Sequence, residues 1–125
     1  MSNLQLDKHT YASLCALLDG RDEVKMCYKT WAIRLTEHVV AIRHHHTNII
    51  EYTDEGHVYL NNGGWYTRTT LFRMARATGL PVRQEDWTWY VGDEEYYNGM
   101  CIALPESTDE PKPTLIPALD CYGIG

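Results

Sequence analysis

Four short runs rich in β-branched, aliphatic and aromatic residues follow one another between residues 26 and 60. They are Met26–Leu35, Val39–His44, Asn48–Thr53 and His57–Leu60. The segment between the last two runs, Asp54-Glu55-Gly56, is typical of a hairpin whose glycine takes a left-handed turn conformation. The middle of the chain is therefore predicted to form an antiparallel β meander, and the fold must belong to a class that contains one.

An amphipathic helix is predicted before the meander, from Asp7 to Gly20. Its apolar side chains recur at helical spacing, at Tyr11, Leu14, Cys15 and Leu18. Asp7 is available as the N-cap, and Gly20 can end the helix.

A second, shorter helix is predicted after the meander. The turn Asn61-Asn62-Gly63-Gly64 precedes it, because two adjacent glycines permit backbone angles that other residues avoid. Thr69 is the predicted N-cap, Gly79 the C-terminal cap, and Pro81 prevents the helix from continuing. Two further strands are expected beyond it, at Asp86–Val91 and Met100–Leu104.

These elements predict an α+β fold in a single domain over residues 1–104, because a chain of 125 residues usually forms one compact domain. From Pro105 onward the chain is rich in proline, acidic and small polar residues, which bury too little apolar surface to offset the entropy lost on ordering. Residues 105–125 are therefore predicted to form a flexible, proline-rich acidic tail. Its apolar cluster Leu115–Leu119 can still dock on the domain or on a partner.

The composition also predicts the environment of the protein. No apolar run approaches the roughly 20 residues needed to cross a bilayer, and the first residues lack a basic region followed by an apolar stretch. We therefore predict a cytoplasmic protein with no membrane partner and no cofactor. Its scattered cysteines are predicted to be free thiols; they are Cys15, Cys27, Cys101 and Cys121.

The negative charge is concentrated in the last third of the chain. Residues 1–83 hold ten basic and eight acidic side chains, whereas residues 84–125 hold one basic and nine acidic side chains. Because the net charge of −6 opposes attraction to a nucleic-acid backbone, general nucleic-acid binding is not expected. An acidic face directed toward a basic partner is expected instead.

Aromatic side chains lie beside this acidic segment. On a strand, Trp87 and Trp89 would share one face, and the other face could fill the core. A surface that combines large aromatic side chains with carboxylates suits a protein interface. The predicted partner-binding residues are Trp87, Trp89, Asp93, Glu94, Glu95, Tyr96 and Tyr97. The alternative interpretation is a core with a solvated loop.

The start of the second helix is a second candidate site. Free backbone N–H groups and the positive end of the helix dipole favour an anion there. Hydroxyl and guanidinium groups surround that point, and the candidate ligand-binding residues are Thr67, Arg68, Thr69, Thr70, Arg73 and Arg76. They could hold a phosphate or a nucleotide. Alternatively, the threonines only cap the helix, and the arginines balance the negative charge of the acidic last third of the chain.

A third candidate is the histidine run at the end of a predicted strand. Alternation along a strand would place His44 and His46 on one face, where they could bind a metal together with Glu51 or Asp54. A solvated strand end explains the same residues. Motifs of nucleophilic or metal-dependent hydrolases are absent from the sequence. A protein that is not an enzyme is therefore expected, and a metal-dependent hydrolase is the weaker alternative.

Two segments of the chain resemble a group of small, largely uncharacterised proteins of tailed bacteriophages. The first is Thr47-Asn48-Ile49-Ile50-Glu51-Tyr52, and the second is the run from Leu60 to Arg73, which carries the pattern LNxGGWxTxTTxxR. Trp89-Tyr90-Val91 and Gly99-Met100 extend the resemblance, which covers roughly residues 40–103. The resemblance implies a phage origin more firmly than an activity.

Small accessory phage proteins often bind and redirect a host component. The leading hypothesis is therefore an accessory protein that binds and inhibits or redirects a host protein, such as a defence or nucleic-acid-processing factor, in the bacterial cytoplasm. Its working surface would be the acidic and aromatic segment. A phosphate- or nucleotide-binding protein is the alternative.

Overall fold

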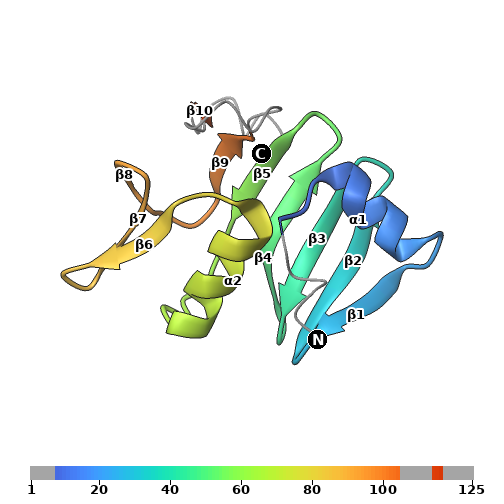
Figure 1. Ribbon diagram of the computed structural model, residues 1–125, viewed down its shortest axis with the longest axis horizontal. Coiled ribbons are helices and arrows are strands. Elements are labelled where there is room, and N and C mark those ends of the chain that lie inside the picture. The colour runs from blue at the N-terminus through green and yellow to red at the C-terminus, as the bar shows by residue number, and fades with distance from the viewer. Residues whose placement is uncertain (1–7, 105–113, 117–125) are drawn as a thin grey trace.

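The computed structural model describes residues 8–104 and 114–116 (Figure 1). Its main element is a seven-stranded antiparallel sheet with strand order β1-β2-β3-β4-β5-β9-β10, and a three-stranded sheet, β6-β7-β8, extends from it. Both helices pack on one face of the larger sheet, α1 against β1 to β3 and α2 against β4; α2 also contacts β6 of the smaller sheet. The predicted α+β class is thus confirmed.

The elements follow in the order expected of a meander interrupted by helices. Their bounds are α1 Tyr11–Leu18, β1 Glu23–Cys27, β2 Thr30–Thr36, β3 Val39–His44, β4 Thr47–Thr53, β5 His57–Leu60, α2 Arg68–Thr78, β6 Val82–Glu85, β7 Thr88–Val91, β8 Glu94–Glu95, β9 Met100–Ala103 and β10 Thr114–Ile116.

The predicted strand Met26–Leu35 is two strands, which is a difference from the sequence prediction. The chain reverses at Tyr28 and Lys29, and Cys27 pairs with Thr30 in the resulting hairpin. Lys29 takes a left-handed conformation with φ 55°. Because the residues of this turn are not glycine, local sequence preference gave no signal for it.

The N-cap of the first helix is Thr10, three residues after the predicted N-cap Asp7. Asp7 lies outside the described residues. The Thr10 side chain accepts a hydrogen bond from the Ser13 backbone N–H, and the Ser13 hydroxyl accepts one from the Thr10 N–H at 2.8 Å. This reciprocal cap satisfies two N–H groups of the helix start. The C-cap is Asp19, in a left-handed conformation, rather than the predicted Gly20.

The second helix is capped by Thr67, not by the predicted Thr69, and it ends as predicted at Gly79 with φ 75°. Its apolar face is anchored to the sheet by a buried hydrogen bond of 2.6 Å from the Tyr52 hydroxyl to the Ala77 carbonyl. Tyr52 and the neighbouring inward side chains of β3, β5 and β9 form one core with both helices. The helix start is therefore held at a fixed place against the sheet.

The predicted strand Asp86–Val91 is the second half of a hairpin. Its first half, β6, was not predicted, and Asp86 and Trp87 form the turn with φ 52° and 69°. Positive φ is uncommon for residues other than glycine, so the sequence gives little sign of a turn here. Trp87 and Trp89 consequently do not share a strand face.

Part of the predicted tail joins the sheet. Thr114–Ile116 pairs with β9 as β10, with Leu115 opposite Ile102. Residues 105–113 and 117–125 of the tail, including Cys121, lie outside the described residues. Cys15 and Cys27 are free thiols. In the part of the chain that the structure describes, no helix has the length and apolar character needed to cross a membrane.

Candidate functional site

A groove of about 780 Å³ lies at the end of the large sheet that is lowest in Figure 1. Three parts of the chain form it: the β1–β2 turn, the β3–β4 turn, and the loop and first turns of α2. The groove therefore brings together two clusters that the sequence suggested separately, the histidines of the β3–β4 turn and the threonines and arginine of α2.

The start of α2 supplies hydrogen-bond donors to this groove. Thr67, Thr69 and Thr70 line it, and the Thr67 hydroxyl oxygen accepts a hydrogen bond from the Thr70 N–H. The N–H group of Thr69, which precedes Thr70 in the first turn, has no acceptor within the described chain. The N–H groups of a helix start carry the positive end of the helix dipole, which favours an anion.

Arg73 extends from α2 to the β1–β2 hairpin. Its Nε donates to the Thr30 hydroxyl oxygen at 2.9 Å, and its Nη2 donates to the Tyr28 carbonyl at 3.4 Å. These bonds hold the half-buried guanidinium in the groove wall. The remaining nitrogen, Nη1, has no hydrogen-bond partner among the residues described and can donate to a ligand.

His44 is buried beside this arginine. Its Nδ1 lies 3.2 Å from the Thr30 hydroxyl oxygen. Burial, and then the nearby positive charge of Arg73 and the neighbouring ring of His45, lower the pKa of His44 to about 4, although a backbone hydrogen bond with Lys29 opposes the shift. His44 is therefore neutral at pH 7, and Arg73 carries the positive charge at this wall.

The three histidines do not alternate along a strand as predicted. β3 ends at His44 and β4 begins at Thr47, so His45 and His46 form the turn between them. His45 takes φ 57°, and both turn side chains are exposed. All three histidines line the same groove for this reason.

Asn62 lies under the groove and was predicted only as a turn residue. Its side chain is 0% exposed, and its Oδ1 accepts a hydrogen bond of 2.8 Å from the Gly64 N–H. Its amide nitrogen Nδ2 has no partner among the described residues. Buried polar atoms nearly always have a hydrogen-bond partner, so this unpaired donor at the groove wall points to a missing acceptor.

The rest of the wall is aromatic. Trp65 and Tyr28 line the groove and keep 65% and 70% of their surface exposed. Neither residue was a predicted site residue. No aspartate or glutamate lines the groove within the described residues, although the chain has 17 of them. The groove is therefore rich in donors and aromatic surface and poor in negative charge.

Two of the predicted ligand-binding residues lie elsewhere. Arg68 lines a shallow surface between α2 and the β6–β7 hairpin, together with Phe72 and Trp87. Arg76 is exposed further along the helix and does not line the groove. The structure thus brings Thr67, Thr69, Thr70 and Arg73 together but not the whole predicted set.

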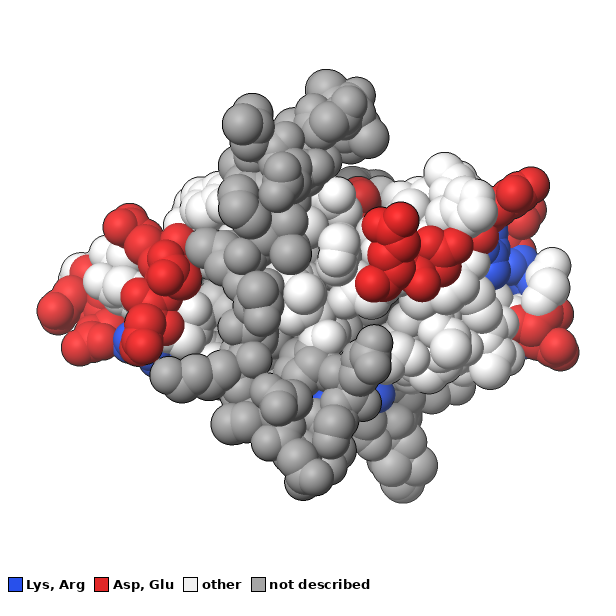
Figure 2. All heavy atoms as spheres, turned by 90° about the horizontal axis from the view of Figure 1, so that it is seen from above, with Lys and Arg blue, Asp and Glu red and all other residues white. Residues whose placement is uncertain are grey.

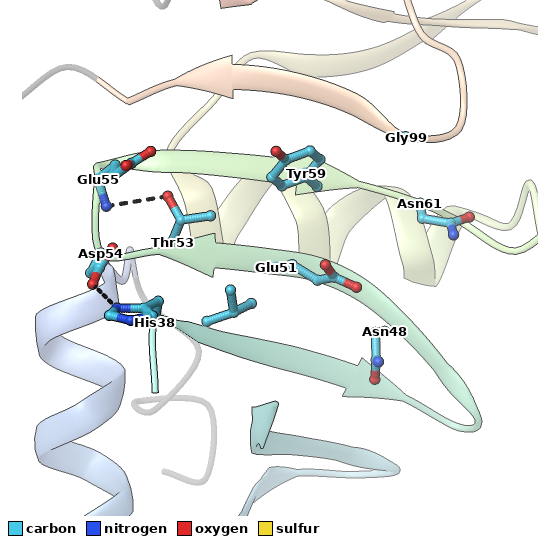
Figure 3. A pocket seen from close by; sticks show the side chains of 10 residues that line it. His38, Asn48, Glu51, Thr53, Asp54, Glu55, Tyr59, Asn61 and Gly99 are labelled. Atoms are coloured by element: carbon cyan, nitrogen blue, oxygen red, sulfur yellow. Dashed lines mark hydrogen bonds and ion pairs between the residues drawn. The ribbon is translucent and has the colours of Figure 1, made fainter. Parts of the chain in front are cut away.

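A second pocket, of about 720 Å³, lies over the opposite face of β3, β4 and β5 (Figure 3). Glu51 and Asp54, the predicted partners of a histidine metal site, line this pocket and not the groove. Strand alternation explains the separation, because Glu51 points away from the face on which its neighbour Tyr52 meets α2. Within the described residues, no three His, Cys, Asp or Glu side chains are grouped to hold a metal.

The β6–β8 sheet, residues 82–95, is called the acidic arm below. It holds five acidic side chains and one arginine, Arg83, which pairs with Glu85 at 2.6 Å. Figure 2 shows acidic side chains gathered at the end of the molecule where Figure 1 draws this sheet. Five of the predicted partner-binding residues are exposed: Trp87, Asp93, Glu94, Glu95 and Tyr97.

The aromatic residues of the acidic arm divide between surface and core. Trp87, at the hairpin turn, is 90% exposed, whereas Trp89 is 2% exposed. Tyr96, just after the arm, is also buried. Trp89 and Tyr96 therefore cannot contact a partner in this conformation, and Trp87 is the large aromatic side chain that the arm presents to solvent.

The sequence matches the family described as Kyanoviridae Gp96 protein over residues 9–103. The chain belongs to this family. The match confirms the phage origin that the resemblance implied. No curated protein and no solved structure matches the chain.

In this Kyanoviridae Gp96 family member the acidic arm and the groove are connected. Trp89, Tyr96 and Tyr66 pack with ring centroids 5.1 to 6.2 Å apart. The Tyr96 hydroxyl oxygen accepts a hydrogen bond of 2.7 Å from the Asn62 N–H, and it donates to Asn98 Oδ1 at 2.5 Å. The residue that carries the unpaired donor is thus positioned by the aromatic cluster under the arm.

Proposed function

We propose that this phage protein binds a small phosphate-bearing ligand in the groove at the start of α2. The observation that carries the proposal is the convergence of unpaired donors on one groove. They come from the backbone N–H group of Thr69, from Arg73 Nη1, and from the buried amide of Asn62. A phosphate offers only acceptors to such donors, and charge-assisted bonds to it are strong.

The same groove is a poor site for a cation. Its lining holds no described carboxylate, and Arg73 would repel a positive ligand. The described histidines of the groove are not grouped with one another or with a carboxylate so as to hold a metal ion. Binding of an anion is therefore favoured here, although the protein as a whole carries a net charge of −6.

The first prediction concerns Arg73. Ribose 5-phosphate is expected to raise the thermal unfolding temperature, since a ligand at about 100 times its Kd stabilises the folded state by about 2.7 kcal/mol. Arg73→Gln is expected to weaken binding by about tenfold or more, because a hydrogen bond to a charged group contributes about 1.5–3 kcal/mol. Isothermal titration calorimetry measures the change.

Arg76→Gln is the matched control, because it removes the same charge from the same helix outside the groove. It should leave the affinity unchanged. Arg73→Lys keeps the positive charge but not the planar guanidinium with its several donors. Its affinity for ribose 5-phosphate should lie between those of the two glutamine variants. Equal weakening by Arg73→Gln and Arg76→Gln would contradict the proposed site, as would the absence of any shift with ribose 5-phosphate.

A second candidate function is binding of a basic host protein by the acidic arm, and Trp87 favours it. Trp87 is 90% exposed and takes φ 69° in a turn, so neither its ring nor its backbone conformation stabilises the isolated protein. It follows Glu85 and Asp86 directly in the chain and belongs to the same small sheet as Glu94 and Glu95, and aromatic anchors of this kind dominate many protein interfaces. The carboxylates would steer a basic surface toward it. A phage accessory protein that inhibits or redirects a host factor would use such a surface.

This second candidate predicts a loss of capture from host lysate. Replacing Asp93, Glu94 and Glu95 by lysine should remove the partners that the unchanged protein retains, because like charges would then face each other. The control replaces three exposed acidic residues outside the arm by lysine, Asp22, Glu37 and Glu55. Retained partners in the arm variant, or an equal loss in the control, would count against this candidate.

A further inference from the structure

We infer that the phosphate-bearing ligand of the groove is a free nucleotide whose base lies against Trp65. This inference rests on the proposed function and names the class of ligand. Three features of the groove that a phosphate alone does not explain support it: the volume of the groove, its aromatic wall and its exposed turn histidines.

The size of the groove exceeds what an inorganic anion needs. Its volume of about 780 Å³ lies within the range of about 300–1,000 Å³ that is usual for sites of organic ligands and cofactors. A phosphate on the N–H groups of α2 would fill only a small part of it. The remaining space needs a larger organic body attached to the phosphate.

The aromatic wall indicates the chemistry of that body. Trp65 and Tyr28 line the groove and stay largely exposed, although they are among the largest side chains of the chain. Planar bases stack on such rings, and each base stacked on an aromatic side chain contributes substantially to affinity. A planar ring joined to a phosphate through a sugar is a nucleotide.

The loop before α2 is built to hold Trp65 at this wall. Gly63 has φ 64°, and a Cβ there would lie 2.8 Å from the hydroxyl oxygen of Thr47, the first residue of β4 after the β3–β4 turn. Only glycine therefore lets the loop approach that turn so closely. The Trp65 N–H donates to the Asn62 carbonyl at 2.9 Å, which fixes the tryptophan backbone next to the unpaired amide of Asn62.

The polar groups around the wall suit a sugar and a base. The exposed imidazoles of His45 and His46 reach the groove from the opposite turn and can exchange hydrogen bonds with hydroxyl groups. The buried Asn62 Nδ2 can donate to a base carbonyl, a ring nitrogen or a phosphate oxygen.

The charge of the protein favours a single nucleotide over a nucleic-acid strand. The described lining of the groove has one arginine, and Lys29 lies beside it with Nζ 5.6 Å from the Tyr28 ring centroid, so few cations face a chain of phosphates. The net charge of −6 would oppose the approach of a strand. A single phosphate is matched to the donors of α2 and Arg73.

The experiment compares ligands that differ by one part. Isothermal titration calorimetry measures the affinity of the full-length protein for ribose 5-phosphate, for each of the four ribonucleoside 5′-monophosphates, and for a single-stranded oligonucleotide. At least one nucleotide is expected to bind about tenfold or more tightly than ribose 5-phosphate. Trp65→Ala should reduce its affinity to that of ribose 5-phosphate, and Trp65→Phe should keep most of the difference.

Trp87→Ala is the matched control, since it removes an exposed tryptophan from the acidic arm, and it should change no affinity. If ribose 5-phosphate binds as tightly as every nucleotide, the base-stacking inference is wrong while phosphate binding stands. If neither ribose 5-phosphate nor any nucleotide binds, the proposed function fails as well. Tighter binding of the oligonucleotide than of every mononucleotide would overturn the assignment to a free nucleotide.

Discussion

Replacing Trp89 by alanine is expected to lower the free energy of unfolding by about 3–5 kcal/mol, the usual cost of truncating a large buried aromatic side chain. Trp89 is 2% exposed and packs edge-on against Tyr66, with ring centroids 5.1 Å apart, and against Tyr96 at 5.4 Å. Its removal leaves a cavity between the acidic arm and the rest of the core. Urea denaturation followed by circular dichroism measures the loss as a lower midpoint with an unchanged slope.

Trp87→Ala is the matched control for this substitution. The two tryptophans lie two residues apart, but Trp87 is 90% exposed at the hairpin turn. Its removal should change the free energy of unfolding by no more than about 0.5 kcal/mol, as is usual at the surface. Equal destabilisation by the two variants would mean that the turn at Asp86 and Trp87 does not form as described.

This pair of residues also marks a limit of prediction from the sequence. Alternation would place both tryptophans on one face of a strand, as the sequence suggested. The turn residues Asp86 and Trp87 interrupt the strand with positive φ, which pairing between β6 and β7 imposes. Tyr28 and Lys29 divide another predicted strand in the same way. Both are two-residue hairpin turns set by the pairing of the strands on either side, and the turn residues themselves gave no sign of them.

Other elements were predictable because their signals are local. Asp54-Glu55-Gly56 forms the expected hairpin between β4 and β5, and Gly79 ends α2 in a left-handed conformation. In both places a glycine follows residues with a clear periodicity, so the backbone geometry can be inferred from a few neighbours. These features gave the correct fold class.

The candidate site was predicted in separate parts. Thr67, Thr70 and Arg73 were recognised from the chemistry of a helix start, and His44 from the histidine run. The groove joins segments far apart in the chain, as the hydrogen bond from Arg73 to Thr30, 43 residues earlier, illustrates, and no local pattern encodes such a contact. Asn62 was missed because an asparagine before two glycines indicates a turn, and its unpaired amide is visible only once the fold buries it.

The stability of the protein is expected to fall as the pH is lowered from about 6.5 to 4, because of His44. Burial and the charge of Arg73 lower the pKa of His44 from 6.5 to about 4. Between these values the unfolded chain binds a proton at His44 that the folded protein does not, so the free energy of unfolding decreases as the pH falls. A pKa difference of this size corresponds to a loss of about 3 kcal/mol in the free energy of unfolding.

Other groups titrate in the same range, and the signs of their effects differ. Asp54 raises the pKa of His38, so that exposed pair adds stability at low pH, which is lost as the pH rises through the raised pKa. Burial raises the pKa of Glu51, which favours the folded state as that carboxyl takes up a proton. The total pH dependence therefore mixes opposing effects, and the contribution of His44 must be measured as a difference.

His44→Gln provides that difference, since glutamine is neutral at every pH in this range and can still bond to Thr30. Urea denaturation at pH 7, 5.5 and 4 should show a pH-dependent loss that is smaller by about 3 kcal/mol in this variant. The control is His46→Gln, at the exposed end of the same turn, which should keep the loss of the unchanged protein. A loss as large in His44→Gln as in the unchanged protein would show that the pKa of His44 is not lowered in the fold. His44 would then gain its charge as the pH falls through about 6.5, and the affinity of the groove for a phosphate should rise over that range.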